Sequence, residues 1–297
     1  MGLVAHRPRV AWRLLRGPVV DYARALRRID MDSVKREKQQ SYWDEVAASF
    51  GAEGQYDLWR RHSDRVNHDL LEAWLPGAPV ARLLKTDLFD EAMSEGLYPL
   101  LARQAKRVDG VDISIQAVAA ASARYPELQA RYADLRQLPY TDGAFDCVVS
   151  NSTLDHFEDR GDIATAVAEL YRVVRPGGQL LVTLDNLQNP VVWLRNHLPQ
   201  KILNRTGIVP YFVGRTLARR GLVRILRETG FEVLETTAIM HCPRTLAVAR
   251  AAAVQKRSDA ERQARFLERL QRWERLRNWP SRYFTGYFVA ARARRPG

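Results

Sequence analysis

Short apolar runs alternate with helical patterns through the middle of the chain. Strands are expected where these runs stand, at 80–84, 107–112, 128–132, 145–150, 179–184, 231–239 and 283–291. Helices are expected at 97–106, 114–124, 163–174 and 216–229, the last ended by Gly230. This alternation is typical of parallel βαβ units. The sequence therefore predicts an α/β fold built on a doubly wound sheet.

The segments outside this alternation have a different character. Residues 1–30 resemble basic helical turns, and 31–75 are expected to be helical, with Tyr42, Trp43, Val46 and Phe50 at helical spacing. Two insertions interrupt the later strands, an irregular one at 186–213 and a largely helical, basic one at 241–280. We therefore expect an N-terminal extension over 1–75 and one domain over 76–297.

The positive charge lies at the two ends of the chain. The net charge is +12, and residues 241–297 alone hold 14 Lys and Arg against four acids. Residues 1–30 hold seven Arg against Asp21 and Asp30. Such flanks suit peripheral contact with an anionic membrane, an acidic substrate or nucleic acid. Solvated helix faces are an equally good interpretation.

Cysteine, histidine and hydropathy patterns narrow the protein class. Two cysteines, Cys147 and Cys242, fit a reducing compartment, so a cytoplasmic protein is expected. The six histidines have no metal-site spacing, and no metal is predicted. No apolar run approaches the roughly 20 residues needed to span a bilayer, so a soluble or peripheral protein is expected.

Polar residues follow three of the expected strands, where ligands bind in doubly wound sheets. Asp112 ends the second strand and can accept hydrogen bonds from both hydroxyls of a ribose; alternatively, Asp112 or Ser114 caps the next helix. Asp134 with Leu135 can hold an adenine amino group and cover the ring, although a plain loop carboxylate is the alternative. Ser150 and Asn151 end the fourth strand and would lie beside a cofactor.

At this point the chain resembles the class I S-adenosylmethionine (SAM)-dependent methyltransferases, in the methyltransferase type 11 group. The resemblance covers roughly 80–184 and rests on three segments in the expected order, GVDIS, ADLRQLPYTDGAFDCVVSNSTLDHF and ELYRVVRPGGQLLVT. It implies a Rossmann-like seven-stranded sheet with helical lid insertions and a methyl-transfer activity. It also implies SAM as cofactor, with Ile113 among the residues that bind it.

The loop after the first strand departs from the family. The family normally has an acid and spaced glycines here, which let the backbone approach the methionine part of SAM. In LKTDLFDEAMSEGL only Gly96 remains. Either the pocket has decayed, or side chains replace the glycines. We favour replacement, with Lys85 on the SAM carboxylate, Asp87 or Glu95 on its ammonium, and Thr86 beside them.

Transfer of an activated methyl group mainly requires an acceptor held in line, and an oxygen acceptor also requires a general base. His156 is the first candidate for this base and Asp155 the second, because both follow the fourth strand. His156 packing or capping the next helix is the alternative. A dehydrogenase is disfavoured, because no G-x-G-x-x-G follows the first strand.

The two insertions are expected to build the substrate side. Apolar residues such as Val191, Trp193 and Leu194, and the stripe Phe266, Leu270, Trp273 and Leu276 with Arg on its edges, suit a small-molecule or lipid-like acceptor. O-methylation is slightly preferred. The alternatives are a non-catalytic SAM-fold protein that binds a partner, and an RNA methyltransferase. No RNA-binding motif is recognised, so nucleic acid is not the expected partner.

Overall fold

The fold is centred on a seven-stranded sheet in the order β3-β2-β1-β4-β5-β7-β6. The computed structural model describes residues 37–47, 57–198 and 214–297. Neighbouring strands from β3 through β5 pair in parallel, whereas β7 is antiparallel to both β5 and β6. The strands are β1 Val80–Lys85, β2 Ala105–Asp112, β3 Gln129–Tyr132, β4 Phe145–Asn151, β5 Val174–Asp185, β6 Glu232–Ile239 and β7 Phe288–Arg294. The predicted seven-stranded, Rossmann-like sheet is confirmed.

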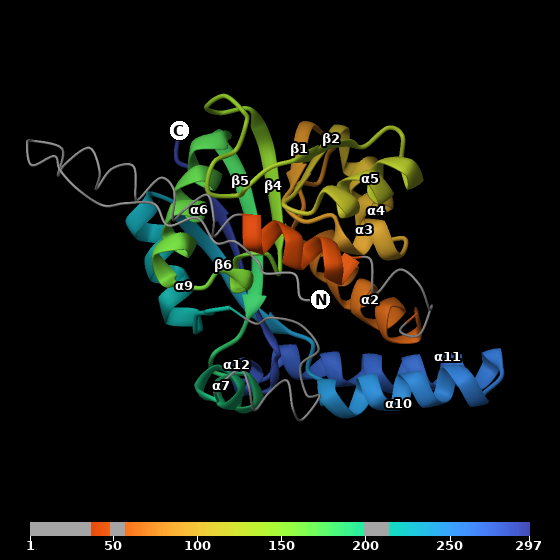
Figure 1. Ribbon diagram of the computed structural model, residues 1–297. Coiled ribbons are helices and arrows are strands. Elements are labelled where there is room, and N and C mark those ends of the chain that lie inside the picture. Colours follow the sequence, from red (N-terminus) through yellow and green to blue (C-terminus); the bar gives the residue numbers. More distant parts are fainter. Residues whose placement is uncertain (1–36, 48–56, 199–213) are drawn as a thin grey trace, which may run out of the picture.

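Helices cover both faces of this sheet (Figure 1). The α-helices are α2 Asp57–Trp74, α3 Phe89–Met93, α4 Tyr98–Gln104, α5 Ile115–Arg124, α6 Arg160–Val173, α7 Pro190–His197, α9 Arg219–Thr229, α10 Arg244–Arg257, α11 Ala260–Gln271 and α12 Arg282–Thr285. Two 3₁₀ helices are η1 Leu154–His156 and η2 Arg272–Asn278, and residues 37–47 are helical. The expected C-terminal glycine of α9 is confirmed, since Gly230 has φ 109°.

Alternating burial along the strands explains the two layers. In β5, Leu181 belongs to the apolar cluster that contains α4 and α5, whereas Leu180 and Val182 belong to the cluster that contains α6 and α9. Successive side chains of a strand point to opposite faces, so a strand apolar at every position must be covered on both. The continuous apolar runs found in the sequence are therefore the strands of a doubly wound sheet.

The predicted beginning of the last strand is wrong. Residues 283–291 were expected to be extended, but 282–285 form α12 and the strand begins at Phe288. The Tyr283 hydroxyl donates to the carbonyl of Thr236 (2.9 Å), which fixes the ring beside β6 rather than in the ladder. An aromatic pair, Tyr283-Phe284, has the composition of a strand but here forms a helical turn.

The insertions are more regular than expected. Residues 190–197 of the first form α7, because the Asn189 side chain accepts hydrogen bonds from the amides of Val191 and Val192 and caps the helix. Residues 199–213 lie outside the described part, as do 1–36 and 48–56. The second insertion forms α10, α11 and η2, as expected, and α10 and α11 pack against α2 (Figure 1).

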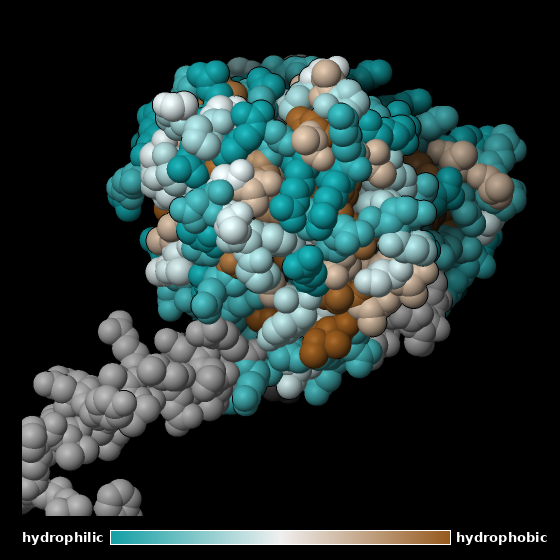
Figure 2. Space-filling model, turned by 90° about the horizontal axis from the view of Figure 1, so that it is seen from above, coloured by the Kyte–Doolittle hydropathy of each residue, from teal (hydrophilic) through white to brown (hydrophobic). Residues whose placement is uncertain are grey.

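The carboxyl ends of β1, β2, β4 and β5 meet at one edge of the sheet, near α7 and α12 (Figure 1). The opposite face of the molecule, seen in Figure 2, is mainly hydrophilic. None of the described helices is both long and apolar enough to cross a bilayer.

Candidate functional site

A cavity of about 740 Å³ lies along the carboxyl edge of the sheet. One wall consists of strand ends and the turns that follow them. The other wall consists of the 37–47 helix, α2, α7, α10 and the beginning of β7. The sequence-predicted residues on this wall are Thr86, Asp87, Asp112, Ile113, Asp134, Leu135, Asn151, Asp155 and His156. Their assigned roles remain predictions.

Four predicted residues do not line the cavity: Lys85, Ser150, Glu95 and Gly96. The side chain of Lys85 is 1% exposed, and its Nζ lies 2.9 Å from Glu91 Oε2. The same ammonium donates to the carbonyl of Asp87. Burial alone would lower the pKa of Lys85, but the carboxylates of Glu91, Asp87 and Asp90 outweigh it and raise the pKa. Geometry therefore gives Lys85 a partner inside the loop, not in the cavity.

The other three residues, Gly96, Glu95 and Ser150, contact the loop or its neighbours outside the cavity. Gly96 has φ 61°, and a Cβ there would lie 2.8 Å from Glu91 Oε1, so glycine is required by the turn and by Glu91. The backbone carbonyl of Glu95 accepts from Tyr125 Oη (2.8 Å), and neither residue lines the cavity. Ser150 is fully buried and accepts from Thr86 Oγ1 (3.0 Å).

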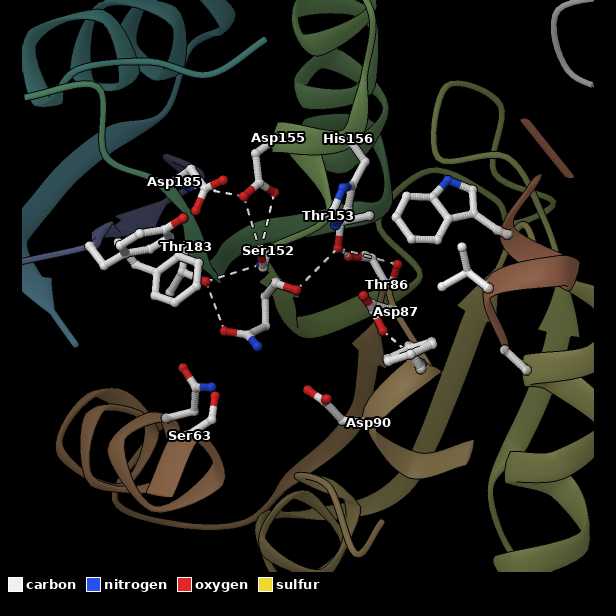
Figure 3. A pocket seen from close by; sticks show the side chains of 18 of the residues that line it. Ser63, Thr86, Asp87, Asp90, Ser152, Thr153, Asp155, His156, Thr183 and Asp185 are labelled. Carbon is white, nitrogen blue, oxygen red and sulfur yellow. Dashed lines mark hydrogen bonds between the residues drawn. The ribbon is translucent and has the colours of Figure 1, made fainter. Parts of the chain in front are cut away.

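Acidic side chains gather at the ends of β1 and β2. Asp87 and Asp112 come from the strand ends, Asp90 from α3 and Asp64 from α2 (Figure 3 shows Asp87 and Asp90). Asp112 accepts from the amides of Leu88 (2.9 Å) and Ser114 (2.8 Å). Each oxygen of Asp112 therefore retains a lone pair that could accept from a ligand.

This crowding changes the acidity of the cluster. Burial, together with the neighbouring Asp90 and Glu91, raises the pKa of Asp64 to about 7. Burial and the nearby Asp112 and Asp90 raise the pKa of Asp87 well above its usual value, although Lys85 opposes the shift. A cation at this end of the cavity would be stabilised, because it would offset the repulsion between the carboxylates.

Two cavity residues of α2 and α3 had no signal in the sequence, Arg60 and Asp90. Arg60 Nη1 lies 3.9 Å from the Asp90 carboxylate, and its guanidinium lies 5.3 Å from the centre of the Phe89 ring. Arg60 is thus a cation on the wall beside the acidic cluster. Helix α2 precedes the first strand, and no local pattern distinguishes Arg60 from the other arginines of that helix.

The ends of β2 and β3 provide the next section of the wall. Asp134 is held by Arg136, whose Nη2 lies 2.7 Å from its carboxylate and whose amide donates to it (2.9 Å). Leu135 and Ile113 contribute apolar surface beside it. Ser114 is the N-cap of α5, since its Oγ accepts from the amide of Ala117 (3.1 Å). The capping alternative is therefore correct for Ser114.

A tight turn follows β4 and carries the two catalytic candidates. Ser152 has φ 51°, and its amide donates to the hydroxyl and the carbonyl of Thr183. Its Oγ donates to Asp155 Oδ2 (3.0 Å), and the same oxygen accepts from the amide of Asp185 (2.9 Å; Figure 3). Burial and Asp185 raise the pKa of Asp155, while His156 lowers it. Asp155 therefore fixes the turn that presents His156.

His156 stands on the cavity wall next to the 37–47 helix. Its ring lies 4.5 Å from the ring of Trp43, edge to face. Trp43 belongs to the leading helix expected from the sequence, although Phe50 of that expectation lies outside the described residues. The geometry brings His156 to the cavity and also gives it a packing partner.

The end of the cavity beyond β5 has a different lining. Arg195 Nη2 lies 2.5 Å from Asp185 Oδ2, and Arg195 Nη1 donates to Tyr287 Oη (2.6 Å). The Arg244 guanidinium lies 4.6 Å from the centre of the Tyr287 ring. Apolar residues surround these groups: Trp59, Val191, Leu194, Leu198, Val248, Ala249, Ala252 and Phe288.

The stripe expected over 262–279 does not line the cavity. Phe266 and Leu270 of α11 pack into the apolar core shared with α2. Helix α10, one element earlier, supplies the cavity residues instead. Among the described residues, no three His, Cys, Asp or Glu side chains are grouped so that they could hold a metal ion. The absence of a metal stays a prediction.

The chain is similar in sequence to known proteins. A family model described as a methyltransferase domain matches residues 93–182. A probable SAM-dependent methyltransferase of Mycolicibacterium smegmatis is 32% identical over 156 residues, covering 52% of this chain and 55% of its own. An O-methyltransferase of Aspergillus sclerotiorum is 30% identical over 143 residues, covering 45% and 49%. The chain thus spans about half the length of these relatives.

A solved structure supports the fold across most of the chain. The putative methyltransferase of Haloferax volcanii, in complex with the Trm112 methyltransferase activator, superposes with a TM-score of 0.55 at 18% identity, covering 86% of this chain and 99% of that one. The sheet order with an antiparallel β7, the family model and the relatives all agree. The chain therefore has the fold of the class I SAM-dependent methyltransferases, and its residues 93–182 match the methyltransferase domain.

Proposed function

We propose that the protein transfers a methyl group from SAM to an apolar small-molecule acceptor, with oxygen as the preferred acceptor atom. The observation that carries this proposal is the continuity of the cavity. It joins the acidic strand ends, where this family holds its cofactor, to the apolar wall of α7 and α10. Its volume of about 740 Å³ is within the range of small-molecule sites.

The residues at the acidic end fit the cofactor by charge. Bound SAM supplies a methyl group that its sulfonium already activates. Asp87 and Asp90 would face its positive groups, Asp112 its ribose, and Arg60 its carboxylate. The raised pKa of Asp87 supports this arrangement, because a cation there replaces repulsion with attraction.

His156 is the proposed general base. An acceptor hydroxyl loses its proton as the new C–O bond forms, and the His156 imidazole on the cavity wall would take that proton. Asp155 acts as a positioning residue, because its carboxylate is engaged by Ser152 and Asp185 inside the turn. The preference for oxygen is also supported by the name of the Aspergillus relative, at 30% identity.

The far wall supports an acceptor with an apolar body and an acidic group. Apolar side chains of α7 and α10 would contact the body. Arg244 lies among the rings of Trp59, Tyr287 and Phe288, at 4.6–5.9 Å, so its charge is set in an apolar surface. An anionic group is attracted most strongly where solvent screening is low.

Titration calorimetry with SAM and S-adenosylhomocysteine tests the cofactor site. Asp112→Asn should weaken binding by about tenfold or more, because an amide cannot accept as strongly from ribose hydroxyls. Asp142→Asn is the matched control, since Asp142 is an exposed carboxylate outside the cavity. No heat of binding by folded, ligand-free wild type would overturn the proposal in favour of a non-catalytic partner-binding role.

A further inference from the structure

Five large apolar side chains are exposed on α7, on α12 and just before α12. We name this group the mouth patch: Val191 (49% exposed), Trp193 (52%), Leu194 (52%), Trp279 (62%) and Phe284 (63%). Burial of large apolar side chains stabilises a fold. A group of them that stays exposed on neighbouring elements is therefore unusual. The indole of Trp193 stacks on His197 (4.3 Å), which holds the ring in place on the surface.

Hydrogen bonds join the elements that carry the mouth patch. The Asn189 side chain donates to the carbonyls of Phe284 (3.3 Å) and Thr285 (3.1 Å), which fastens α7 to α12. The amide of Arg282 donates to the carbonyl of Trp279, which places Trp279 at the beginning of α12. Figure 1 shows α7 and α12 side by side below the carboxyl edge of the sheet.

The patch borders the cavity. Val191 and Leu194 belong to both, since they are half exposed and also line the cavity. A surface that bound the mouth patch would therefore lie next to the proposed acceptor wall. The opposite face is mainly hydrophilic (Figure 2).

The segment that carries Trp279 and Phe284 is basic. From residue 272 to 285 the chain holds four Arg against one acid. That acid, Glu274, is buried and accepts from the amides of Met240 and His241, so it adds little charge to the surface. Arg275 and Arg277, close to Trp279 in η2, are exposed.

We propose that the mouth patch docks on an anionic lipid membrane. Aromatic and aliphatic side chains insert into the interface between headgroups and acyl chains, while the surrounding arginines attract acidic headgroups. Charge complementarity favours this occupant over a neutral apolar partner, which would leave the basic border unpaired. The docking goes beyond the proposed function, because it concerns where the protein finds its acceptor, whatever the acceptor is.

Vesicle flotation of the full chain tests the docking. The wild type should bind vesicles of phosphatidylcholine with phosphatidylserine about tenfold or more tightly than phosphatidylcholine alone. The double variant Trp193→Ala, Phe284→Ala should bind both kinds of vesicle less tightly. The double variant Arg275→Gln, Arg277→Gln should lose only the part of the binding that depends on phosphatidylserine. Leu234→Ala on β6, also an exposed apolar residue, is the control that should bind as wild type does.

Three results would overturn the docking: no vesicle binding by wild type, binding that the Trp193 and Phe284 variant retains, or a dimer in sedimentation that this variant dissolves. Binding to RNA that competes with vesicles and depends on the arginines alone would assign the basic border to nucleic acid. Calorimetry with SAM on the same samples separates loss of docking from failure of the cofactor site.

Discussion

The ammonium of Lys85 and the carboxylate of Glu91 form an ion pair that is closed to solvent, with Nζ 2.9 Å from Oε2 and side-chain exposures of 1% and 0%. The other oxygen of Glu91 accepts from the amides of Leu97 (2.9 Å) and Tyr98 (3.1 Å), at the beginning of α4. The loop that follows β1 is thus shaped by an internal salt bridge.

Lys85→Met should lower the free energy of unfolding by about 3–5 kcal/mol, because it leaves the Glu91 carboxylate buried without its partner. Urea denaturation monitored by circular dichroism measures this loss. Adding Glu91→Gln should recover part of it, since the amide oxygen still accepts from α4. Lys106→Met, at an exposed position, should stay within about 0.5 kcal/mol of wild type. Equal stability of Lys85→Met and wild type would contradict the structural role of the pair.

Binding of SAM should weaken as the pH falls through 7. Burial and the neighbouring Asp90 and Glu91 raise the pKa of Asp64 to about 7. Positive groups of the cofactor favour the ionised carboxylate, so binding releases a proton below pH 7 and is strongest above it. Calorimetry in buffers of different ionisation enthalpy measures the proton released.

Asp64→Asn should flatten this pH dependence. Glu72→Gln, at an exposed position on the same helix, should leave it unchanged. A pH profile that is the same in Asp64→Asn as in wild type would assign the titration to another group.

His156→Gln should reduce kcat by about 10²–10⁴-fold for an oxygen acceptor while leaving SAM affinity unchanged. His156→Phe distinguishes the two interpretations of this residue, because phenylalanine can still pack against Trp43. A general base is lost in both variants. Steady-state kinetics that show near-normal turnover in His156→Phe would leave only the packing role.

Arg244→Gln should weaken the binding of an apolar carboxylic acid by about tenfold or more. Binding of the methyl ester of the same acid should not change. Displacement of a fluorescent fatty acid gives this measurement without any methyl transfer. Arg250→Gln is the matched control, since Arg250 is exposed on the same helix and does not line the cavity. An equal loss for acid and ester would show that Arg244 acts through packing alone.

The fold could be predicted because several strands contain a short buried apolar run. The Phe145–Asn151 strand is the clearest example, and residues 180–184 of β5 follow the same pattern. The boundary before β7 failed, and it involved Tyr283, whose position depends on a hydrogen bond to the distant Thr236. Such a partner is 47 residues away and leaves no trace in a local pattern.

The site was predictable only where topology dictates it. Asp112, Asp134 and Asn151 follow strands whose ends must meet, and the cavity lies there. Asp64 and Arg244 come from helices far away in the sequence and carry no motif. Lys85 shows the converse difficulty, since a charge at a strand end can serve a neighbour in the loop as well as a ligand.

The contact of Arg195 with Asp185 and Tyr287 ties the end of β5, α7 and the beginning of β7 into one support. The side chains proposed to contact the acceptor are separate from that support, since Val191, Leu194, Val248 and Ala252 line the cavity with apolar surface and take no part in these hydrogen bonds. Acceptor preference can therefore diverge through these four positions while the scaffold stays intact. Reprogramming the protein toward new acceptors should begin with a combinatorial library at those four positions, with Arg195 kept fixed.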